Sequence, residues 1–168
     1  FHLDVPGDPS SASFFAAAAA LIPNSSITIR NILLNPTRTG FFKILEKMNG
    51  GVEWRNIKNV NGESIGDVHI YWKPLNAIDI TKEMIPDVID ELPIISILAS
   101  QAEGPTIVSG AEELRVKESD RIKAICENLY SMGCEVIEKK DGFIINGPCK
   151  LHNTNIITYG DHRIAMSF

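Results

Sequence analysis

The order of predicted elements repeats along the chain, and this repeat constrains the fold more than any other feature. One copy reads strand, helix, strand, helix and hairpin, as HLDVPGD, DPSSASFFAAAAALI, SSITIRNI, TGFFKILEKMNGG, VEWRNI and DVHIYW. The next copy reads NAIDI, DELPIISILASQA, PTIVSGA, SDRIKAICENLYSMG, CEVIEKK and GFIING. A third copy begins with the strand-like NIITYGD and the helix start DHRIAMSF. The pattern predicts an α/β (α+β) fold of βαβαββ units in one globular domain, at about 1–72, 73–148 and, only begun, 149–168.

Aspartates mark the helix starts of the three copies. Asp8 is a predicted N-cap that is followed by proline, and Asp161 precedes the last helix. We start the first helix of the second copy at Asp90, which keeps Pro93 in its first turn. Aspartate is a common N-cap in any helix, which explains each residue singly but not the shared order of elements. The three aspartates are therefore predicted to be equivalent, and the two hairpins are predicted to turn at Asn-Gly (61–62) and Asp-Gly (141–142).

Composition limits the classes of function. The net charge of −5 argues against a nucleic-acid surface, and the alanine-rich stretch 14–22 is too short to span a bilayer. Three cysteines (126, 134 and 149) form an odd set without metal-ligand spacing, which predicts reduced thiols in a cytoplasmic protein. No metal-binding or P-loop motif is present, so no metal site is expected. The chain begins with Phe1 and ends at Phe168 inside an apolar pattern, so we expect a piece of a longer protein.

Cationic residues lie at predicted helix starts, where the helix dipole is already positive. Lys117 and Arg121 flank one start, and His162 and Arg163 occupy the first turn of another. Each such cation is unfavourable by up to ~1 kcal/mol unless an anion is bound, and a helix N-terminus favours anions. Ser11 adds a hydroxyl at a third start. The pattern favours an anion site.

The alternative is that the two arginines extend into solvent or pair with Asp120 and Asp161. Carboxylates beside an anion site are candidates for proton transfer. Asp90 and Glu118 stand in loops that enter helices and suit this role, although capping or simple surface charge explains them equally well. Asp87, like Asp120, is better explained by capping and surface charge.

Four motifs, GDPSSASFFAAAA, IDELPI, LRVKESDR and YGDHRIAMSF, together resemble the 3-phosphoshikimate 1-carboxyvinyltransferase (EPSP synthase) family, the target of glyphosate. The DELP form is similar to the bacterial branch. The resemblance implies the enolpyruvyl transferase fold, an inside-out α/β barrel in which two domains of three βαβαββ units face each other across a cleft. It also implies that this chain is a fragment of the C-terminal half, without its partner domain.

The resemblance implies a reaction in the shikimate pathway, which leads to chorismate and the aromatic amino acids. The 5-hydroxyl of shikimate 3-phosphate takes the enolpyruvyl group of phosphoenolpyruvate, phosphate leaves, and no metal or organic cofactor takes part. Its substrates and the missing N-terminal domain are the implied partners, and the fragment alone is expected to be inactive. Two alternatives stay open: a UDP-N-acetylglucosamine enolpyruvyl transferase, and a non-catalytic phosphate-binding module on the same fold.

The same resemblance implies roles for individual residues. Asp90 is the implied base at the shikimate hydroxyls, Glu118 the second proton-transfer acid, and Lys117 a residue of the substrate site and the proton chain. Two arginines are expected to bind phosphoenolpyruvate, with a histidine beside them, and a serine to bind shikimate 3-phosphate. The implied substrate-binding residues are Ser11, Asp90, Lys117, Arg121, His162 and Arg163. Phe14 and Glu113 depart from the better-known enteric and plant pattern, which has Tyr and Asn there, so contacts of these two with substrate are not expected.

Overall fold

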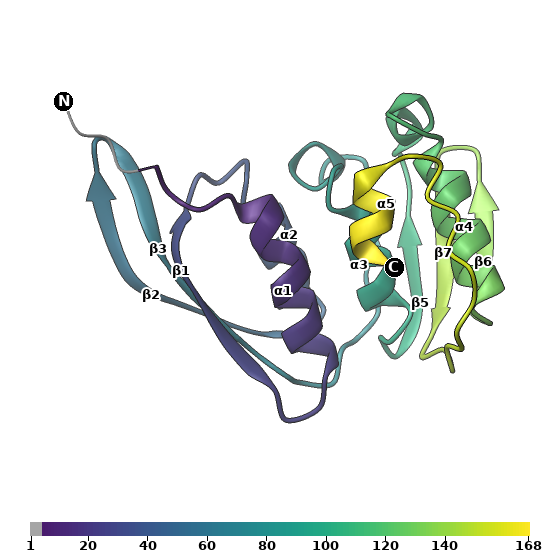
Figure 1. The fold of residues 1–168 in the computed structure, drawn as a ribbon, viewed down its shortest axis with the longest axis horizontal. Helices are drawn as coiled ribbons and strands as arrows, with labels where there is room; N and C mark the ends of the chain where they lie inside the picture. Colours follow the sequence, from purple (N-terminus) through teal and green to yellow (C-terminus); the bar gives the residue numbers. More distant parts are fainter. Residues whose placement is uncertain (1–4) are drawn as a thin grey trace. The chain divides into compact units, whose positions relative to one another are not determined.

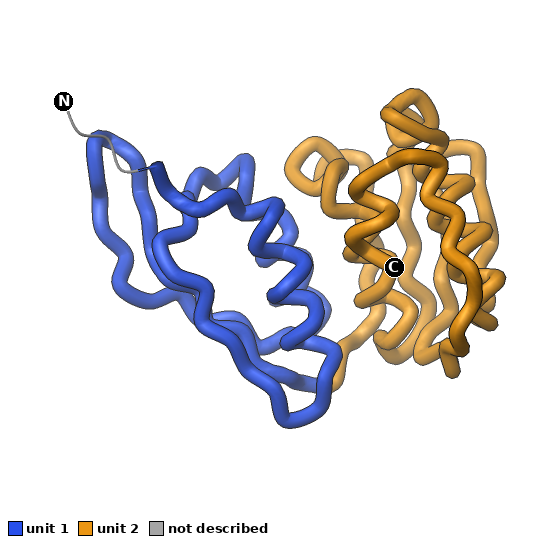
Figure 2. The backbone as a smooth tube through the Cα atoms, in the orientation of Figure 1, with its two compact units in different colours: residues 1–73 blue, residues 74–168 orange. Residues whose placement is uncertain are grey.

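The computed structural model describes residues 5–168 and divides into two compact units, 1–73 and 74–168 (Figures 1 and 2). The first predicted strand, HLDVPGD, falls partly on residues 1–4, which lie outside the described part. From its remainder, Gly7 forms a parallel bridge to Ile32. Each unit is described by itself.

Unit 1 holds two helices and a three-stranded antiparallel sheet. Its elements are α1 (Pro9–Leu21), β1 (Ser26–Leu33), α2 (Gly40–Lys47), β2 (Gly51–Val60) and β3 (Glu63–Tyr71). The strand order is β1-β3-β2, and α1 packs against β1 and β3 while α2 packs against β2 (Figure 1). The alanines of α1 make this close approach possible, because four of the five residues in the run 16–20 are buried.

Unit 2 repeats this arrangement and adds one further helix. Its elements are β4 (Asp79–Ile80), the 3₁₀ turn η1 (Ile85–Asp87), α3 (Leu92–Ala99), β5 (Gly104–Val108), the 3₁₀ turn η2 (Glu112–Val116), α4 (Arg121–Ser131), β6 (Glu135–Lys139), β7 (Gly142–Gly147) and α5 (His162–Ser167). The sheet order is β4-β5-β7-β6, in which only β4 and β5 are parallel. With the bridge at Gly7, unit 1 has the same order of pairings, so the predicted fold of repeated βαβαββ units is confirmed.

The predicted start of α3 is wrong. Asp8 and Asp161 are N-caps whose carboxylates accept backbone N–H groups. In α3 the N-cap position is Glu91, one position after Asp90, and its side chain makes no capping hydrogen bond. An N-cap at Asp90 would put Pro93 at the third helical position, and proline has no N–H to offer to the cap. The carboxylate of Asp90 is thereby released from capping, and it faces cationic side chains of its own unit.

The predicted strand NIITYGD is also wrong, since its residues, 155–161, have no strand pairing. A side chain of α4 takes the place of a neighbouring strand. The carboxamide of the buried Asn128 accepts from the N–H of Ile157 at 2.9 Å and donates to its C=O at 3.0 Å. The main chain of this segment is thus held at Ile157, and a turn at Tyr159 and Gly160 leads from there to Asp161.

Both predicted hairpins are present. Asn61 and Gly62 have φ angles of 54° and 87°, the left-handed values that an Asn-Gly turn requires. The second turn lies one residue earlier than predicted, at Lys140 and Asp141, because Gly142 already pairs with Lys139.

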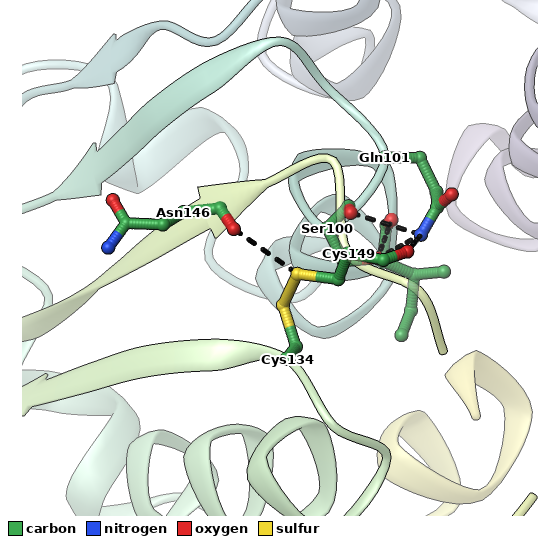
Figure 3. The surroundings of a disulfide bond; sticks show 6 residues. Ser100, Gln101, Cys134, Asn146 and Cys149 are labelled. Atoms are coloured by element: carbon green, nitrogen blue, oxygen red, sulfur yellow. Dashed lines mark hydrogen bonds between the residues drawn. A yellow bond between two sulfur atoms is a disulfide. The ribbon is translucent and has the colours of Figure 1, made fainter. Parts of the chain in front are cut away.

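The prediction of three reduced thiols is wrong for two of them. Cys134 and Cys149, 15 residues apart, form a disulfide with a Cα–Cα distance of 5.1 Å (Figure 3). Hydrogen bonds to the end of α3 anchor the same point: the N–H of Cys149 donates to Ser100, and Gln101 Nε2 donates to the Cys149 carbonyl. Cys126 is a free, buried thiol, and burial raises its pKa to about 12, which makes it unreactive at neutral pH.

Candidate active site around Arg121

Arg121 is the first residue of α4 and the centre of an ionic cluster in unit 2. Its side chain is only 1% exposed, yet the guanidinium contacts three carboxylates. Nε lies 2.8 Å from Asp161 Oδ2, Nη1 lies 2.9 Å from Asp90 Oδ1, and Nη2 lies 2.6 Å from Glu118 Oε2. Burial alone would lower the pKa of Arg121, but these acids, Asp161 foremost, raise it above its usual value. The side chain is therefore a permanent cation.

The carboxylates resolve the sequence anomaly of a cation at a helix N-terminus. Of the two alternative partners predicted for Arg121, the pairing with Asp161 is present. The other acid, Asp120, instead pairs with Arg115 at 2.9 Å and caps α4 by accepting from Lys123 N. A buried charge needs such partners, because breaking a buried ion pair is unfavourable by roughly 3–5 kcal/mol.

Asp161 is the most enclosed acid of the cluster and was predicted only as a cap and a possible partner. Its side chain has no exposed surface. Besides Arg121, it accepts from Arg163 N at 2.9 Å and from Ser119 Oγ at 3.1 Å. Burial alone would raise the pKa of Asp161, but the bonds from Arg121 and from the α5 backbone hold it below 3.8. The sequence signal for this role is the acid directly before a cationic helix start.

Asp90 and Lys117 form the open side of the cluster. Lys117 Nζ lies 3.6 Å from Asp90 Oδ1, and the Asp90 side chain is 44% exposed. Burial pushes the pKa of Asp90 up, but the hydrogen bond from Arg121 and the charges of Lys117 and Arg163 hold it below its ordinary value. Asp90 is thus an ionised carboxylate with one side open to solvent.

A second ion pair links α5 to the start of α3. Arg163 Nη1 lies 3.6 Å from Oε1 of Glu91, and both side chains are largely buried. Glu91 belongs to the DELP motif but was not predicted as a site residue, because sequence alone did not put α5 beside α3. His162 is exposed on α5.

The structure brings five of the predicted site residues into one cluster and leaves one in the other unit. The clustered residues are Asp90, Lys117, Glu118, Arg121 and Arg163. Ser11 belongs to unit 1, where its Oγ and N–H both donate to Asp8 Oδ2 at the start of α1.

The cluster holds more carboxylates than cations. Lys117, Arg121 and Arg163 face Asp90, Glu91, Glu118 and Asp161. An anionic ligand must therefore replace carboxylate partners rather than fill an unoccupied cationic pocket. Two partners of Arg121 are open to such exchange, since the side chains of Asp90 and Glu118 are 44% and 54% exposed.

Within residues 5–168, no group of His, Cys, Asp and Glu side chains is arranged to hold a metal ion. Nor does any helix of the described chain reach the length and apolar character that a membrane crossing requires.

The order and pairing of the strands and helices match the enolpyruvyl transferase fold. An EPSP synthase structure from Acinetobacter baumannii superposes with a TM-score of 0.93 at 40% identity, over 97% of this chain and 38% of that one. The enolpyruvyl transferase NikO from Streptomyces tendae has a TM-score of 0.59 at 18% identity, over 90% of this chain and 32% of its own, a likeness of fold alone.

Within that class, the family model for EPSP synthase (3-phosphoshikimate 1-carboxyvinyltransferase) matches residues 1–168. The chain is 52% identical to the 3-phosphoshikimate 1-carboxyvinyltransferase of Persephonella marina, over 99% of this chain and 39% of that protein. It is 46% identical to the enzyme of the same name from Oceanobacillus iheyensis, over 98% and 38%. The chain belongs to the EPSP synthase family, and it spans about 39% of the length of these relatives.

Proposed function

We propose that the full-length protein containing this chain transfers the enolpyruvyl group of phosphoenolpyruvate to the 5-hydroxyl of shikimate 3-phosphate and releases phosphate. The observation that carries the proposal is the ionic cluster around Arg121. It is built from the LRVKESDR, DELP and GDHRIAMS motifs of a chain that belongs to the EPSP synthase family. The chain supplies part of the site, and the remainder of the protein, including the partner domain, supplies the rest.

The geometry of Arg121 suits reversible anion binding. The buried Asp161 holds Nε and so keeps the guanidinium in place, while Nη1 and Nη2 point to the more exposed Asp90 and Glu118. A carboxylate or phosphate of the substrate can take the place of these two acids, because bidentate contacts to arginine are among the strongest charge-assisted hydrogen bonds.

Replacement of the two acids by substrate also makes Asp90 a stronger base. In this structure the bond from Arg121 lowers the pKa of Asp90, so Asp90 is a weak base while it is held. When phosphoenolpyruvate takes over the guanidinium, that bond is lost and the affinity of Asp90 for a proton rises. Asp90 is then the base for the 5-hydroxyl. Glu118, released in the same step, and Lys117 carry the proton for the methylene carbon.

Three further assignments follow from the family resemblance. Arg163, held by Glu91 in the cluster, is the second arginine for phosphoenolpyruvate, and His162 lies beside it on α5. Ser11, at the N-terminus of α1, binds the phosphate of shikimate 3-phosphate. The enzyme is proposed to act in the cytoplasm, which separation of cell compartments followed by immunodetection checks.

The proposal is tested by phosphate release from the two substrates in the full-length protein. Arg121→Lys keeps the charge but cannot serve two acids and a bidentate anion, so we expect the KM for phosphoenolpyruvate to rise at least tenfold. Arg55→Lys is the matched control, since Arg55 pairs with Glu53 on β2, in unit 1. Equal kinetics for both variants would contradict the role of Arg121. Turnover with UDP-N-acetylglucosamine in place of shikimate 3-phosphate would contradict the proposed acceptor.

The chain of residues 1–168 alone is expected to be inactive, because it covers only part of the relatives' length. Phosphate release by the purified chain would show that the site is complete without the partner domain.

A further inference from the structure

Arg115 of the LRVKESDR motif contacts two acids and two main-chain carbonyls of unit 2. Its Nε donates to the carbonyl of Lys140 at 2.7 Å, and Nη2 donates to that of Lys139. Nη1 lies 2.9 Å from Asp120 Oδ2, and Nη2 lies 2.9 Å from Glu138 Oε1. One guanidinium thus joins the loop before α4 to the end of β6 and the turn that follows it.

These contacts enclose the segment that presents the proposed proton-transfer residues. The Arg115–Asp120 pair bridges both ends of the stretch 116–119, which carries Lys117 and Glu118. Asp120 also caps α4 through Lys123 N, so the clamp fixes the helix start. Residues 117–119 lie between η2 and α4 and have no regular backbone pairing. The stretch is therefore held at its ends by side chains.

We propose that Arg115 is a positioning residue, which keeps the stretch that presents Lys117 and Glu118 beside Asp90 and Arg121, a role that rests on the proposed function. Lys117 meets Asp90 at 3.6 Å, and Glu118 meets Arg121 at 2.6 Å, only while the segment keeps its path. Arg115 itself contacts the hairpin and Asp120 and touches no predicted substrate ligand.

The arrangement requires arginine rather than any cation. The guanidinium offers donors along two edges, so it serves the hairpin carbonyls and the two acids at once. A lysine ammonium is a single point of charge and cannot bridge both sides. Arg115→Lys therefore keeps the charge and the aliphatic stem but opens the clamp.

Steady-state kinetics of the full-length protein test the proposal. We expect Arg115→Lys to lower kcat by about 10- to 100-fold, since small misplacements of catalytic groups have effects of this size, while both KM values change less than about threefold. Arg55→Lys, which removes a single ion pair to Glu53 elsewhere, is the control and should leave kcat unchanged. Millimolar guanidinium should restore part of the activity of Arg115→Ala, because the free cation can remake the bonds to the two acids and the hairpin carbonyls. An Arg115→Lys enzyme with the kcat of the parent would overturn the proposal.

Amide hydrogen exchange separates this proposal from the proposed function. In Arg115→Lys the amides of Lys123 and Ala124, which are bonded to Asp120 at the start of α4, should exchange at least tenfold faster, while those of β5 and β7 keep the rates of the parent. If the parent protein releases no phosphate from the two substrates, the proposed function fails, and faster exchange at Lys123 and Ala124 in the variant still supports the clamp. Unchanged exchange at these amides overturns the clamp whatever the activity.

Discussion

In each unit an arginine–aspartate pair links the starts of the first two helices, but the arginine is exposed in unit 1 and buried in unit 2. In unit 1, Arg38, just before α2, meets Asp8, the cap of α1, at 2.7 Å. In unit 2, Arg121, the first residue of α4, meets Asp90, just before α3, at 2.9 Å. Both pairs tie the start of the first helix of a unit to the start of its second helix.

Burial separates the two pairs. Arg38 and Asp8 are 49% and 44% exposed, and Arg38 has a further contact at 3.2 Å to Ser10 Oγ. Arg121 is 1% exposed and has three acids. The comparison teaches that an arginine–aspartate pair between two helix starts serves as a surface link in unit 1 and as the centre of the candidate site in unit 2.

The largest expected effect is the loss of Arg121. Arg121→Ala leaves Asp161 buried without its main cation, so the free energy of unfolding of the chain should fall by about 3–5 kcal/mol. The effect in unit 2 is measured by urea denaturation, with amide hydrogen exchange at β5 and β7 as the probe. The matched control is Arg38→Ala, discussed last. A loss below 1 kcal/mol would mean that the three acids are stable without the arginine and that the contrast in burial has no energetic counterpart.

The disulfide gives a second difference, since all three cysteines lie in unit 2. Reduction with a dithiol should lower the unfolding free energy of unit 2 by about 3 kcal/mol, as expected for a loop of 15 residues. Both tryptophans, Trp54 and Trp72, lie in unit 1, so their fluorescence follows that unit separately. Its denaturation midpoint should stay unchanged on reduction. A Cys134→Ser variant that is as stable as the oxidised chain would contradict the stabilising role of the bond.

How far the sequence predicts the molecule differs between elements and contacts. Periodicity and caps were sufficient for the repeat, because it follows from local order along the chain. Cations at helix starts indicated an anion site, but the roles of Asp90, Lys117 and Glu118 came from the family resemblance. The start of α3 was missed because Pro93 removes an amide that a cap at Asp90 would need. The role of Glu91, the pairing of Asn128 with Ile157, and the disulfide depend on how distant segments pack, which no local pattern contains.

Low pH should destabilise unit 2 through protonation of Asp90 and Asp161. Both carboxyls have a pKa below 3.8 in the folded chain, so the folded state binds fewer protons there than the unfolded chain does. Their contribution to stability is therefore complete above pH 3.8 and is lost as the pH falls through the folded pKa values. Asp161→Asn should flatten this acid limb in a plot of unfolding free energy against pH. An unchanged slope in the variant would show that other carboxyls cause the acid loss.

The smallest expected effect closes the comparison. Arg38→Ala removes an ion pair whose two side chains are nearly half exposed, and such surface pairs contribute about 0–1 kcal/mol. Asp8 keeps its role as the cap of α1, because its Oδ2 accepts from both the N–H and the Oγ of Ser11. Tryptophan fluorescence should therefore give a denaturation midpoint close to that of the parent, and added salt should erase the remaining difference by screening the pair. A loss as large as that of Arg121→Ala would show that exposure does not decide the strength of the pair. The two ion pairs would then contribute equally to the free energy of unfolding, despite their different exposure.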